Sequence, residues 1–505
     1  MANPPPTDPG PALALAGRPV PAPDLGWGDL AGSAVGVWGV GVEGAASVRR
    51  LRALGVDPAL VDDRPGPAVV GGRPVLATAG GGLDALAGCE VVVKAPGISR
   101  YRTDVVALAD RGVLVAGGLG LWMHDADRDR VACVTGTKGK STTTAIAGHL
   151  CSRLGRRPLV AGNIGRPPWD PEAGTGFDLW LVEMSSFQAT DLPASPAVVA
   201  VTSLSPDHLD WHGGVAAYYR DKLSACDRPG ARLTVADGTS ELLREHRPQL
   251  GPEVRWVLPT DPDLDGRWVA ALGLVGAHNR RNALLARAVL SALGVAGAAD
   301  AGAIERAAAG FEGLDSRLHP IGTVGGVEFV DDSLSTNGLS AMAALEAFEG
   351  RRLAILVGGH DRGIDYLPLG QRLAGREDPT LVVTLPASGT RVHAAVELAS
   401  RASRLTDTSP GTGPGAGGIE VVDADDLAAA TATAFTWARP DGVVLLSPAA
   451  PSFGQFRDYR ERAGAFAEAM RECGRGPGAA GVGHRVTPGG AGRGGSRSRR
   501  GPAPA

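Results

Sequence analysis

The chain has 505 residues, a length typical of two to four domains. Hydrophobic residues make up 44% of it, which is enough for complete cores, and the net charge of −4 gives no electrostatic reason to expect nucleic-acid binding. No run of about 18 uncharged apolar residues occurs, so we expect no membrane span. The scattered cysteines form no C-x-x-C pair, which is typical of reduced thiols in a cytoplasmic protein.

Both ends of the chain differ in composition from the rest. Residues 1–24 are rich in Pro and Ala, and residues 474–505 are rich in Gly and Arg with no acidic residue, so we expect both tails to be disordered. Three folded blocks lie between them, at residues 25–115, 116–313 and 314–473. Each block alternates apolar strands with helical segments, which predicts an α/β fold with parallel sheets covered on both faces.

The first block opens with an apolar segment that runs into a glycine-rich turn. Gly39, Gly41 and Gly44 have the spacing G-x-G-x-x-G, and a second apolar segment ends at Asp62 and Asp63. This β-turn-α-β pattern is typical of a dinucleotide-binding unit. On its own the pattern is weak, and it leaves a nicotinamide-dependent oxidoreductase open.

The second block contains a phosphate-binding loop of unusual form. The position six residues before Lys140 is Val134, where the common G-x-x-x-x-G-K-[ST] loop has glycine. Glycines in such a loop let backbone N–H groups approach phosphate oxygens, the lysine bridges the outer phosphates, and a following hydroxyl holds Mg²⁺. The residues concerned are Gly136, Thr137, Lys138, Gly139, Lys140, Ser141 and Thr142.

Other chemically capable residues follow in the same block. Glu183 ends an apolar strand, where a carboxylate is well placed to bind Mg²⁺ beside phosphates. His208 and His212 come next, although a single histidine is more often structural than functional. Lys222 would be repelled by divalent cations unless CO₂ converts it to an anionic carbamate.

A motif at the end of the second block suits a nucleotide base. His278, Asn279 and Asn282 fall at a predicted loop–helix boundary, and the two asparagines share a helix face. Amide side chains can hydrogen-bond an adenine edge, but helix caps and turns explain them equally well.

Together these motifs resemble the Mur ligase family of peptidoglycan synthesis, whose phosphate-binding loop has the short form G-T-x-G-K-[ST]. Three segments are similar to the branch that adds glutamate to UDP-N-acetylmuramoyl-L-alanine: G-N-I-G-R-P at 162–167, E-M-S-S-F-Q at 183–188, and L-S-P-A-A-P-S-F-G-Q-F-R-D-Y-R-E-R-A-G-A-F at 446–466. The likeness covers residues 33–472. It excludes only the tails.

The resemblance implies a three-domain architecture. The first block would be a Rossmann-like UDP-binding domain, the second a central P-loop ATPase domain, and the third a C-terminal Rossmann-like α/β domain that closes over the site. The implied substrates are ATP, glutamate and UDP-N-acetylmuramoyl-L-alanine, and the implied state is a cytoplasmic monomer. The implied reaction passes through an acyl phosphate made from ATP.

The resemblance also implies a role for individual residues. The positions matching the UDP-substrate site are Val42, Glu43, Asp62, Asp63, Arg64, Gly97 and Asn163. The ATP site would comprise the loop from Gly136 to Thr142 together with Asn279, Asn282, Arg317 and Asp332. Two Mg²⁺ ions would be held by Ser141, Thr142 and Glu183, and by His208 with carbamylated Lys222. The implied catalytic residues are Lys140, Glu183, His208 and Lys222, and the glutamate-binding positions are Thr336, Arg362, Ser452 and Tyr459.

The chain departs from the family pattern in the third block. Leu334 replaces a lysine of the family's D-S-K-A-T-N segment, and Arg362 replaces another lysine. Arginine grips a carboxylate as a planar fork whereas lysine acts as a point charge, so the substitutions alter how the incoming amino acid is held. These changes favour a sub-branch that attaches L-glutamate, with the D-glutamate enzyme as the alternative. A folate polyglutamate ligase and an inactive paralogue are more distant alternatives.

Overall fold

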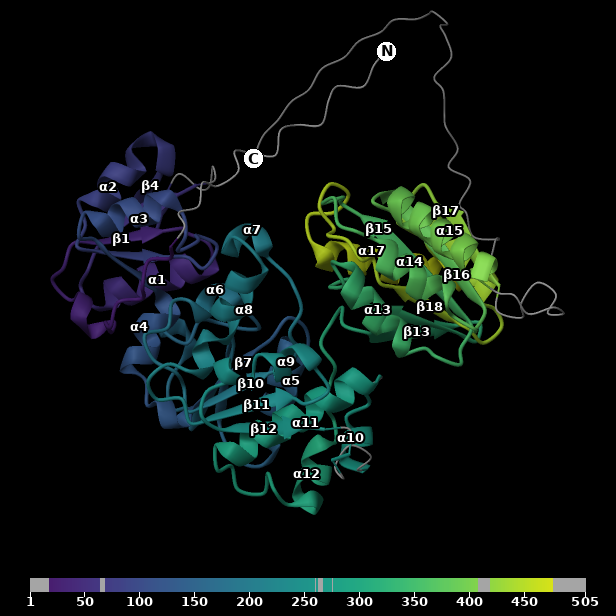
Figure 1. The fold of residues 1–505 in the computed structure, drawn as a ribbon, viewed down its shortest axis with the longest axis horizontal. Coiled ribbons are helices and arrows are strands. Elements are labelled where there is room, and N and C mark those ends of the chain that lie inside the picture. Colours follow the sequence, from purple (N-terminus) through teal and green to yellow (C-terminus); the bar gives the residue numbers. More distant parts are fainter. Residues whose placement is uncertain are drawn as a thin grey trace, which may run out of the picture.

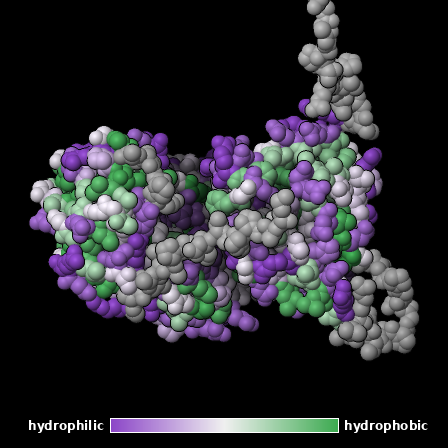
Figure 2. Space-filling view, turned by 90° about the horizontal axis from the view of Figure 1, so that it is seen from above, coloured by the Kyte–Doolittle hydropathy of each residue, from purple (hydrophilic) through white to green (hydrophobic). Residues whose placement is uncertain are grey.

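The computed structural model describes residues 18–63, 69–258, 260–261, 267–274, 276–406 and 418–475. Within these residues three six-stranded sheets follow one another along the chain. They form three bodies, coloured purple to blue, teal, and green to yellow in Figure 1. None of the described helices is both long and apolar enough to cross a membrane. Polar side chains cover most of the face shown in Figure 2, with hydrophobic ones scattered between them.

The first sheet has the strand order β3-β4-β2-β1-β5-β6. Its strands are β1 (Val35–Trp38), β2 (Ala59–Asp62), β3 (Val69–Val70), β4 (Arg73–Ala77), β5 (Val91–Lys94) and β6 (Leu114–Gly117), and its helices are α1 (Val42–Ala53), α2 (Leu83–Ala87) and α3 (Thr103–Asp110). The strands pair in parallel except β3, which is antiparallel to β4. The predicted parallel sheet thus carries one antiparallel strand at this edge. Gly71 and Gly72 both have positive φ, which allows the tight turn that joins β3 to β4.

The second sheet is parallel throughout, with the order β12-β11-β10-β7-β9-β8. Its strands are β7 (Val131–Thr135), β8 (Pro158–Gly162), β9 (Leu179–Glu183), β10 (Val198–Val201), β11 (Leu233–Asp237) and β12 (Val254–Val257). The helices of this part are α4 (Gly118–Asp125), α5 (Lys140–Arg153), α6 (Ser186–Ala189), α7 (Leu209–His212), α8 (Val215–Leu223), α9 (Glu241–Glu245), α10 (Arg267–Ala271), α11 (Ala277–Ala292) and α12 (Ala301–Ala308). Every residue of β7 and β10 is buried, as expected for central strands covered on both faces.

The third sheet has the order β13-β14-β18-β15-β16-β17. Its strands are β13 (His319–Val324), β14 (Val327–Asp331), β15 (Leu353–Gly359), β16 (Thr380–Ala387), β17 (Ile419–Asp423) and β18 (Val443–Leu446), and its helices are α13 (Gly338–Glu346), α14 (Leu367–Ala374), α15 (Gly389–Thr406), α16 (Leu427–Ala438) and α17 (Tyr459–Cys473). The edge strand β13 is antiparallel to β14, and the other strands of this sheet pair in parallel.

The N-terminal tail is shorter than predicted. Val20 is buried, and its backbone N–H donates to the carbonyl oxygen of Arg100 at 3.1 Å. The Arg100 guanidinium in turn donates to the carbonyl oxygens of Val20 and Pro21. This stretch therefore belongs to the first domain rather than to a disordered tail. Residues 1–17 and 476–505 lie outside the described part. The first sheet ends at Gly117, two residues beyond the predicted boundary at 115.

The first and second domains share a core and a buried ion cluster. One hydrophobic cluster runs continuously from Val35 in β1 to Val131 in β7. Within the same interface Asp191 lies 2.9 Å from Lys94 Nζ and 2.6 Å from Arg100 Nε. Burial lowers the pKa of Lys94, and the neighbouring Asp191 carboxylate opposes this. Because breaking a buried ion cluster leaves an uncompensated charge, these contacts hold the two domains in a fixed relation.

Candidate active site

The phosphate-binding loop connects β7 to α5 through two glycines with positive φ. Gly136 has φ +133° and Gly139 has φ +89°, and a Cβ atom added to Gly139 would lie only 2.6 Å from Asn282 Oδ1. Only glycine fits this position without strain. A second segment braces the loop, since the backbone N–H of Lys138 donates to Ser203 Oγ at 2.8 Å.

Lys140, the first residue of α5, folds back over the loop. Its Nζ donates to the carbonyl oxygens of Gly136 at 3.0 Å and Thr137 at 3.1 Å. Burial lowers the pKa of Lys140 to about 8, while the Glu183 carboxylate acts in the opposite direction. The amine therefore lies beside the backbone groups that would receive a phosphate.

Glu183 is the last residue of β9 and is buried. Its Oε2 atom makes no hydrogen bond to any described residue. A buried carboxylate oxygen without a partner is costly, and a bound cation removes that cost. Nearby, Ser141 Oγ accepts a hydrogen bond from Arg317 Nη2 at 2.9 Å. This pair of oxygen ligands suits a hard divalent cation.

Lys222 lies on α8 and is 2% exposed. Its Nζ donates to Gly136 O at 3.0 Å and lies 4.9 Å from the centre of the Tyr218 ring. Burial, followed by the charge of Lys140, lowers the pKa of Lys222 well below its usual range. Among the described residues no carboxylate forms an ion pair with it, so its surroundings favour the neutral amine, the form that reacts with CO₂.

The two histidines of the same region differ in their surroundings. His208 has a positive φ of 51°, and its ring lies 4.9 Å from that of Phe187. Burial lowers its pKa. His212 is 1% exposed, with Nδ1 2.7 Å from Asp221 Oδ2 and Nε2 3.0 Å from Ser186 Oγ. His208 therefore faces a cavity, whereas His212 is part of the buried framework.

One cavity brings most of these groups together. Its walls come from the first domain, the phosphate-binding loop, β8, α6, α7 and α8. The lining residues are Pro96, Thr137, Lys140, Asn163, Ser185, Ser186, Phe187, Asp207, His208, Tyr218 and Lys222. Asn163 also contacts Glu183, the candidate metal ligand, because the backbone N–H of Asn163 donates to the carbonyl oxygen of Glu183 at 3.1 Å.

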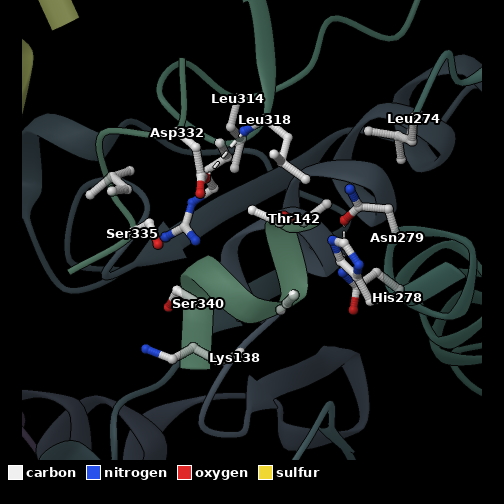
Figure 3. A pocket seen from close by; sticks show the side chains of 16 residues that line it. Lys138, Thr142, Leu274, His278, Asn279, Leu314, Leu318, Asp332, Ser335 and Ser340 are labelled. Atoms are coloured by element: carbon white, nitrogen blue, oxygen red, sulfur yellow. Dashed lines mark hydrogen bonds between the residues drawn. The ribbon is translucent and has the colours of Figure 1, made fainter. Parts of the chain in front are cut away.

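A second cleft runs between the central and third domains (Figure 3). Its central-domain wall contains Lys138, Gly139, Thr142, Asn279 and Asn282, and its third-domain wall contains Arg317, Asp332 and Leu334. Thr142 lies between the His278–Asn279 side and the Asp332 side in this view. Asn282 donates to Asn279 Oδ1 at 3.1 Å, as expected for residues on one helix face.

Two titratable groups of this cleft have strongly shifted pKa values. Burial lowers the pKa of His278 to about 4, and its Nδ1 makes no hydrogen bond to a described residue. Burial also raises the pKa of Asp332 to about 7, although Ser447 Oγ donates to its Oδ2 at 2.7 Å. At neutral pH His278 is therefore uncharged, whereas Asp332 is about half protonated.

The predicted uridine-side residues are largely engaged within the protein. Asp62 accepts a hydrogen bond from the Val40 N–H at 2.8 Å, which fixes the glycine turn. Asp63 accepts from Trp38 Nε1 at 3.3 Å. Val42 is 76% exposed, and Arg64 lies outside the described residues.

Two further uridine-side residues contact the central domain. Glu43 accepts from Gln188 Nε2 at 2.7 Å, and burial raises the pKa of Glu43 to about 7. The carbonyl oxygen of Gly97 accepts from Trp211 Nε1 at 3.1 Å. These positions join the two domains.

The predicted glutamate-binding residues are not all brought to the central site. Tyr459 lines a large cleft together with Ser141, Asn163, Glu183, Arg317 and Leu334. Arg362 is exposed and donates to the carbonyl oxygen of Thr336 at 3.3 Å, and neither it nor Ser452 lines this cleft. His319 and Arg460 do line it, and neither was predicted. The only sequence signal for Arg460 is its position next to Tyr459.

Comparison with known proteins identifies the family. Residues 134–240 match the Mur ligase middle domain, and residues 316–450 match the Mur ligase, glutamate ligase domain. The chain is 42% identical to the UDP-N-acetylmuramoyl-L-alanine--L-glutamate ligase of a Micromonospora species, over 88% of this chain and 98% of the relative. It is 39% identical to the protein of that name from Salinispora tropica, over the same shares. The chain belongs to the Mur ligase family.

Solved structures of Mur ligases share the fold. The MurC ligase of Thermotoga maritima matches with a TM-score of 0.52 at 18% identity, over 87% of this chain and 99% of that structure. A MurF structure from Acinetobacter baumannii matches with a TM-score of 0.50 at 16% identity, over 83% and 85%. The predicted three-domain α/β architecture is confirmed, and so is the prediction of an ATP-dependent peptide ligase of peptidoglycan precursor synthesis. The oxidoreductase alternative is thereby excluded for this Mur ligase.

Proposed function

We propose that this Mur ligase joins the amino group of L-glutamate to the alanyl carboxylate of UDP-N-acetylmuramoyl-L-alanine, with cleavage of ATP to ADP and phosphate. The two relatives described above carry that activity in their names. The observation that carries the proposal is the single cavity bounded by Lys140, His208 and Lys222, with first-domain residue Pro96 in its wall. A reaction that joins a nucleotide-linked acid to ATP needs such a meeting point.

The chemistry proceeds in two steps. The alanyl carboxylate attacks the γ-phosphorus of ATP, a P–O bond to ADP breaks, and an acyl phosphate forms. The glutamate amine then attacks the acyl carbon, and phosphate leaves as the amine loses its proton. Lys140 and Arg317 offset the negative charge that gathers when a carboxylate approaches a triphosphate. Closure of the third domain excludes water, which protects the acyl phosphate from hydrolysis.

Magnesium fits the residues of the site. The unpartnered Oε2 of Glu183, together with Ser141 and Thr142, would hold one ion, and His208 with carbamylated Lys222 would hold a second. Bound magnesium would neutralise phosphate charge. The burial of Lys222 and its lowered pKa support the carbamate, because only an unprotonated amine adds to CO₂. Asn279 and Asn282 would hold the adenine, with Asp332 on the opposite wall of the cleft.

The stereochemistry of the amino acid is part of the proposal. The relatives' names specify L-glutamate, and Leu334 removes a cation from the cleft wall while Arg362 changes another. Inverting an α-carbon exchanges the directions of its carboxylate, amine and side chain, so a pocket for the other enantiomer needs its cations in other places. Thr336, Arg362, Ser452 and Tyr459 would bind the amino acid, the first three after movement of the third domain.

The test is a purified-enzyme assay with UDP-N-acetylmuramoyl-L-alanine, ATP, Mg²⁺ and either glutamate enantiomer. We expect ADP and the ligated product with L-glutamate, at a kcat/KM at least about tenfold above that for D-glutamate. Equal or faster turnover of D-glutamate would contradict the assignment of handedness. Absence of ADP with both enantiomers would contradict the proposed reaction. The predicted cytoplasmic location and monomeric state remain predictions, and size-exclusion chromatography tests the second.

A further inference from the structure

A chain of buried polar groups links the first domain to the wall of the reaction cavity. Tyr101 OH donates to both carboxylate oxygens of Asp221 at 2.9 Å. Asp221 Oδ2 lies 2.7 Å from His212 Nδ1, and His212 Nε2 lies 3.0 Å from Ser186 Oγ. All four side chains are buried, and none belongs to the phosphate-binding loop. We call these four residues the relay.

The direction of each hydrogen bond follows from the chemistry of the groups. A carboxylate only accepts, so His212 Nδ1 carries the hydrogen that faces Asp221. In the neutral ring Nε2 is then the acceptor, and the Ser186 hydroxyl donates to it. Burial, reinforced by the Asp221 charge, raises the pKa of Tyr101 to about 12, so the phenol remains a donor. Each member of the relay is therefore hydrogen-bonded, and removing the Tyr101 hydroxyl takes one donor from the buried Asp221 carboxylate, which keeps its contact with His212.

The relay lies beside two further ties between the domains. Ser99 Oγ donates to the carbonyl oxygen of Trp211 at 2.8 Å, and Trp211 Nε1 donates to the carbonyl oxygen of Gly97 at 3.1 Å. Trp211 is in α7, the helix that begins directly after His208. The first-domain segment 97–101 is thus hydrogen-bonded to α7, which follows His208, and to α8, which carries Lys222.

Asp221 and Lys222 are neighbours on α8 but face different partners. Successive residues of an α-helix point about 100° apart. Asp221 faces Tyr101 and His212, whereas Lys222 Nζ reaches Gly136 O of the phosphate-binding loop at 3.0 Å. Any shift of α8 that breaks the Asp221 contacts therefore also moves Lys222 away from the loop.

We infer that the relay is a positioning device, which sets Lys222 against the phosphate-binding loop and Ser186 in the wall of the reaction cavity, and makes their placement depend on the first domain. The inference rests on the proposed function, in which the first domain binds the UDP substrate and carbamylated Lys222 acts at the ATP site. Tyr101, His212 and Asp221 act through other groups and are positioning residues rather than catalytic ones.

The test removes one hydroxyl group. In Tyr101→Phe the ring stays, and the hydroxyl that donates to Asp221 and accepts from Arg220 Nη2 is lost. The matched control is Tyr219→Phe. Tyr219 is on α8, the helix of Asp221 and Lys222, and its buried ring packs against His246 and lies outside the relay. We expect Tyr101→Phe to lower kcat about tenfold with the KM for ATP within about twofold of wild type. Tyr219→Phe should leave both unchanged, and Asp221→Asn should give a larger fall than Tyr101→Phe.

A second measurement is independent of turnover. After equilibration with ¹³C-bicarbonate, the carbamate resonance of Lys222 is integrated by ¹³C NMR, with Lys222→Ala as the blank. A several-fold lower signal in Tyr101→Phe than in Tyr219→Phe, together with the fall in kcat, supports the relay. Equal signals, or equal kcat values, in the two variants would overturn it. A wild type that shows the carbamate signal but no ligation would contradict the proposed function, and the NMR comparison would still decide the relay.

Discussion

The charge of Lys140 gives a quantitative prediction for nucleotide binding. Its pKa is about 8 because the amine is buried, so the side chain is mostly charged at pH 7 and mostly neutral at pH 9. A phosphate binds the charged form. Because the folded protein holds this proton less tightly than free lysine does, the affinity for ATP should fall as the pH rises through 8. At pH 9 about one molecule in ten retains the charge, so Kd should rise about tenfold, which is about 1.4 kcal/mol.

The assay measures the Kd for ATP by calorimetry, in EDTA, at several pH values between 7.5 and 9.5. This window lies above the last ionisation of the triphosphate, so the ligand charge stays constant. Lys140→Arg provides the control, because a guanidinium remains charged throughout the window. We expect about a tenfold weakening between pH 7.5 and 9 for the wild type and a flat profile for the arginine variant. A wild-type Kd that changes less than about twofold, or an equal slope in the variant, would refute the reasoning.

Three other predictions follow from the site. Lys222→Ala should lose most turnover while binding the UDP substrate normally, as calorimetry would show, and full activity would remove the carbamate role. Gly139→Ala should abolish tight ATP binding, because the new Cβ would meet Asn282 Oδ1 at 2.6 Å in a left-handed backbone conformation; retained affinity would contradict this steric argument. Burial raises the pKa of Asp332 from 3.8 to about 7, so the folded state holds an extra proton between these values and loses stability as the pH rises, by about 4 kcal/mol at pH 8. Asp332→Asn should therefore reduce the fall in melting temperature between pH 5 and 8. An equal fall in the variant and the wild type would contradict the raised pKa of Asp332.

The parts of the site that the sequence predicts are those that are continuous along the chain. Gly136 to Thr142 form one loop because a buried strand and a helix flank them, and both are visible as patterns in the sequence. Glu183 is likewise placed by the end of its own strand. Local sequence thus determines where these groups lie, and the resemblance to a family adds the roles.

The relay could not be predicted in the same way. Tyr101 and Asp221 are 120 residues apart, and their contact exists only because the first and central domains share a core. His212 was open to either a structural or a functional interpretation, and its burial against Asp221 favours the structural one. The edge strand β13 was missed for a different reason. Its residues include Pro320 and Gly322, which weaken any strand pattern in the sequence.

The replacement of the family lysine by Leu334 removes one positive charge from the cleft wall, but other cationic side chains still line the cleft. Leu334 lines the cleft that contains Glu183, and the same cleft is lined by His319 and Arg460 on the third domain. Arg460 forms no ion pair with a described carboxylate, and its guanidinium lies 5.2 Å from the centre of the Tyr459 ring. A stacked guanidinium is held in one plane and can meet a carboxylate with two parallel hydrogen bonds. A lysine at 334 would present a point charge from a different direction. Under the proposed specificity for L-glutamate, Arg460 would supply from another direction the positive charge that is missing at Leu334.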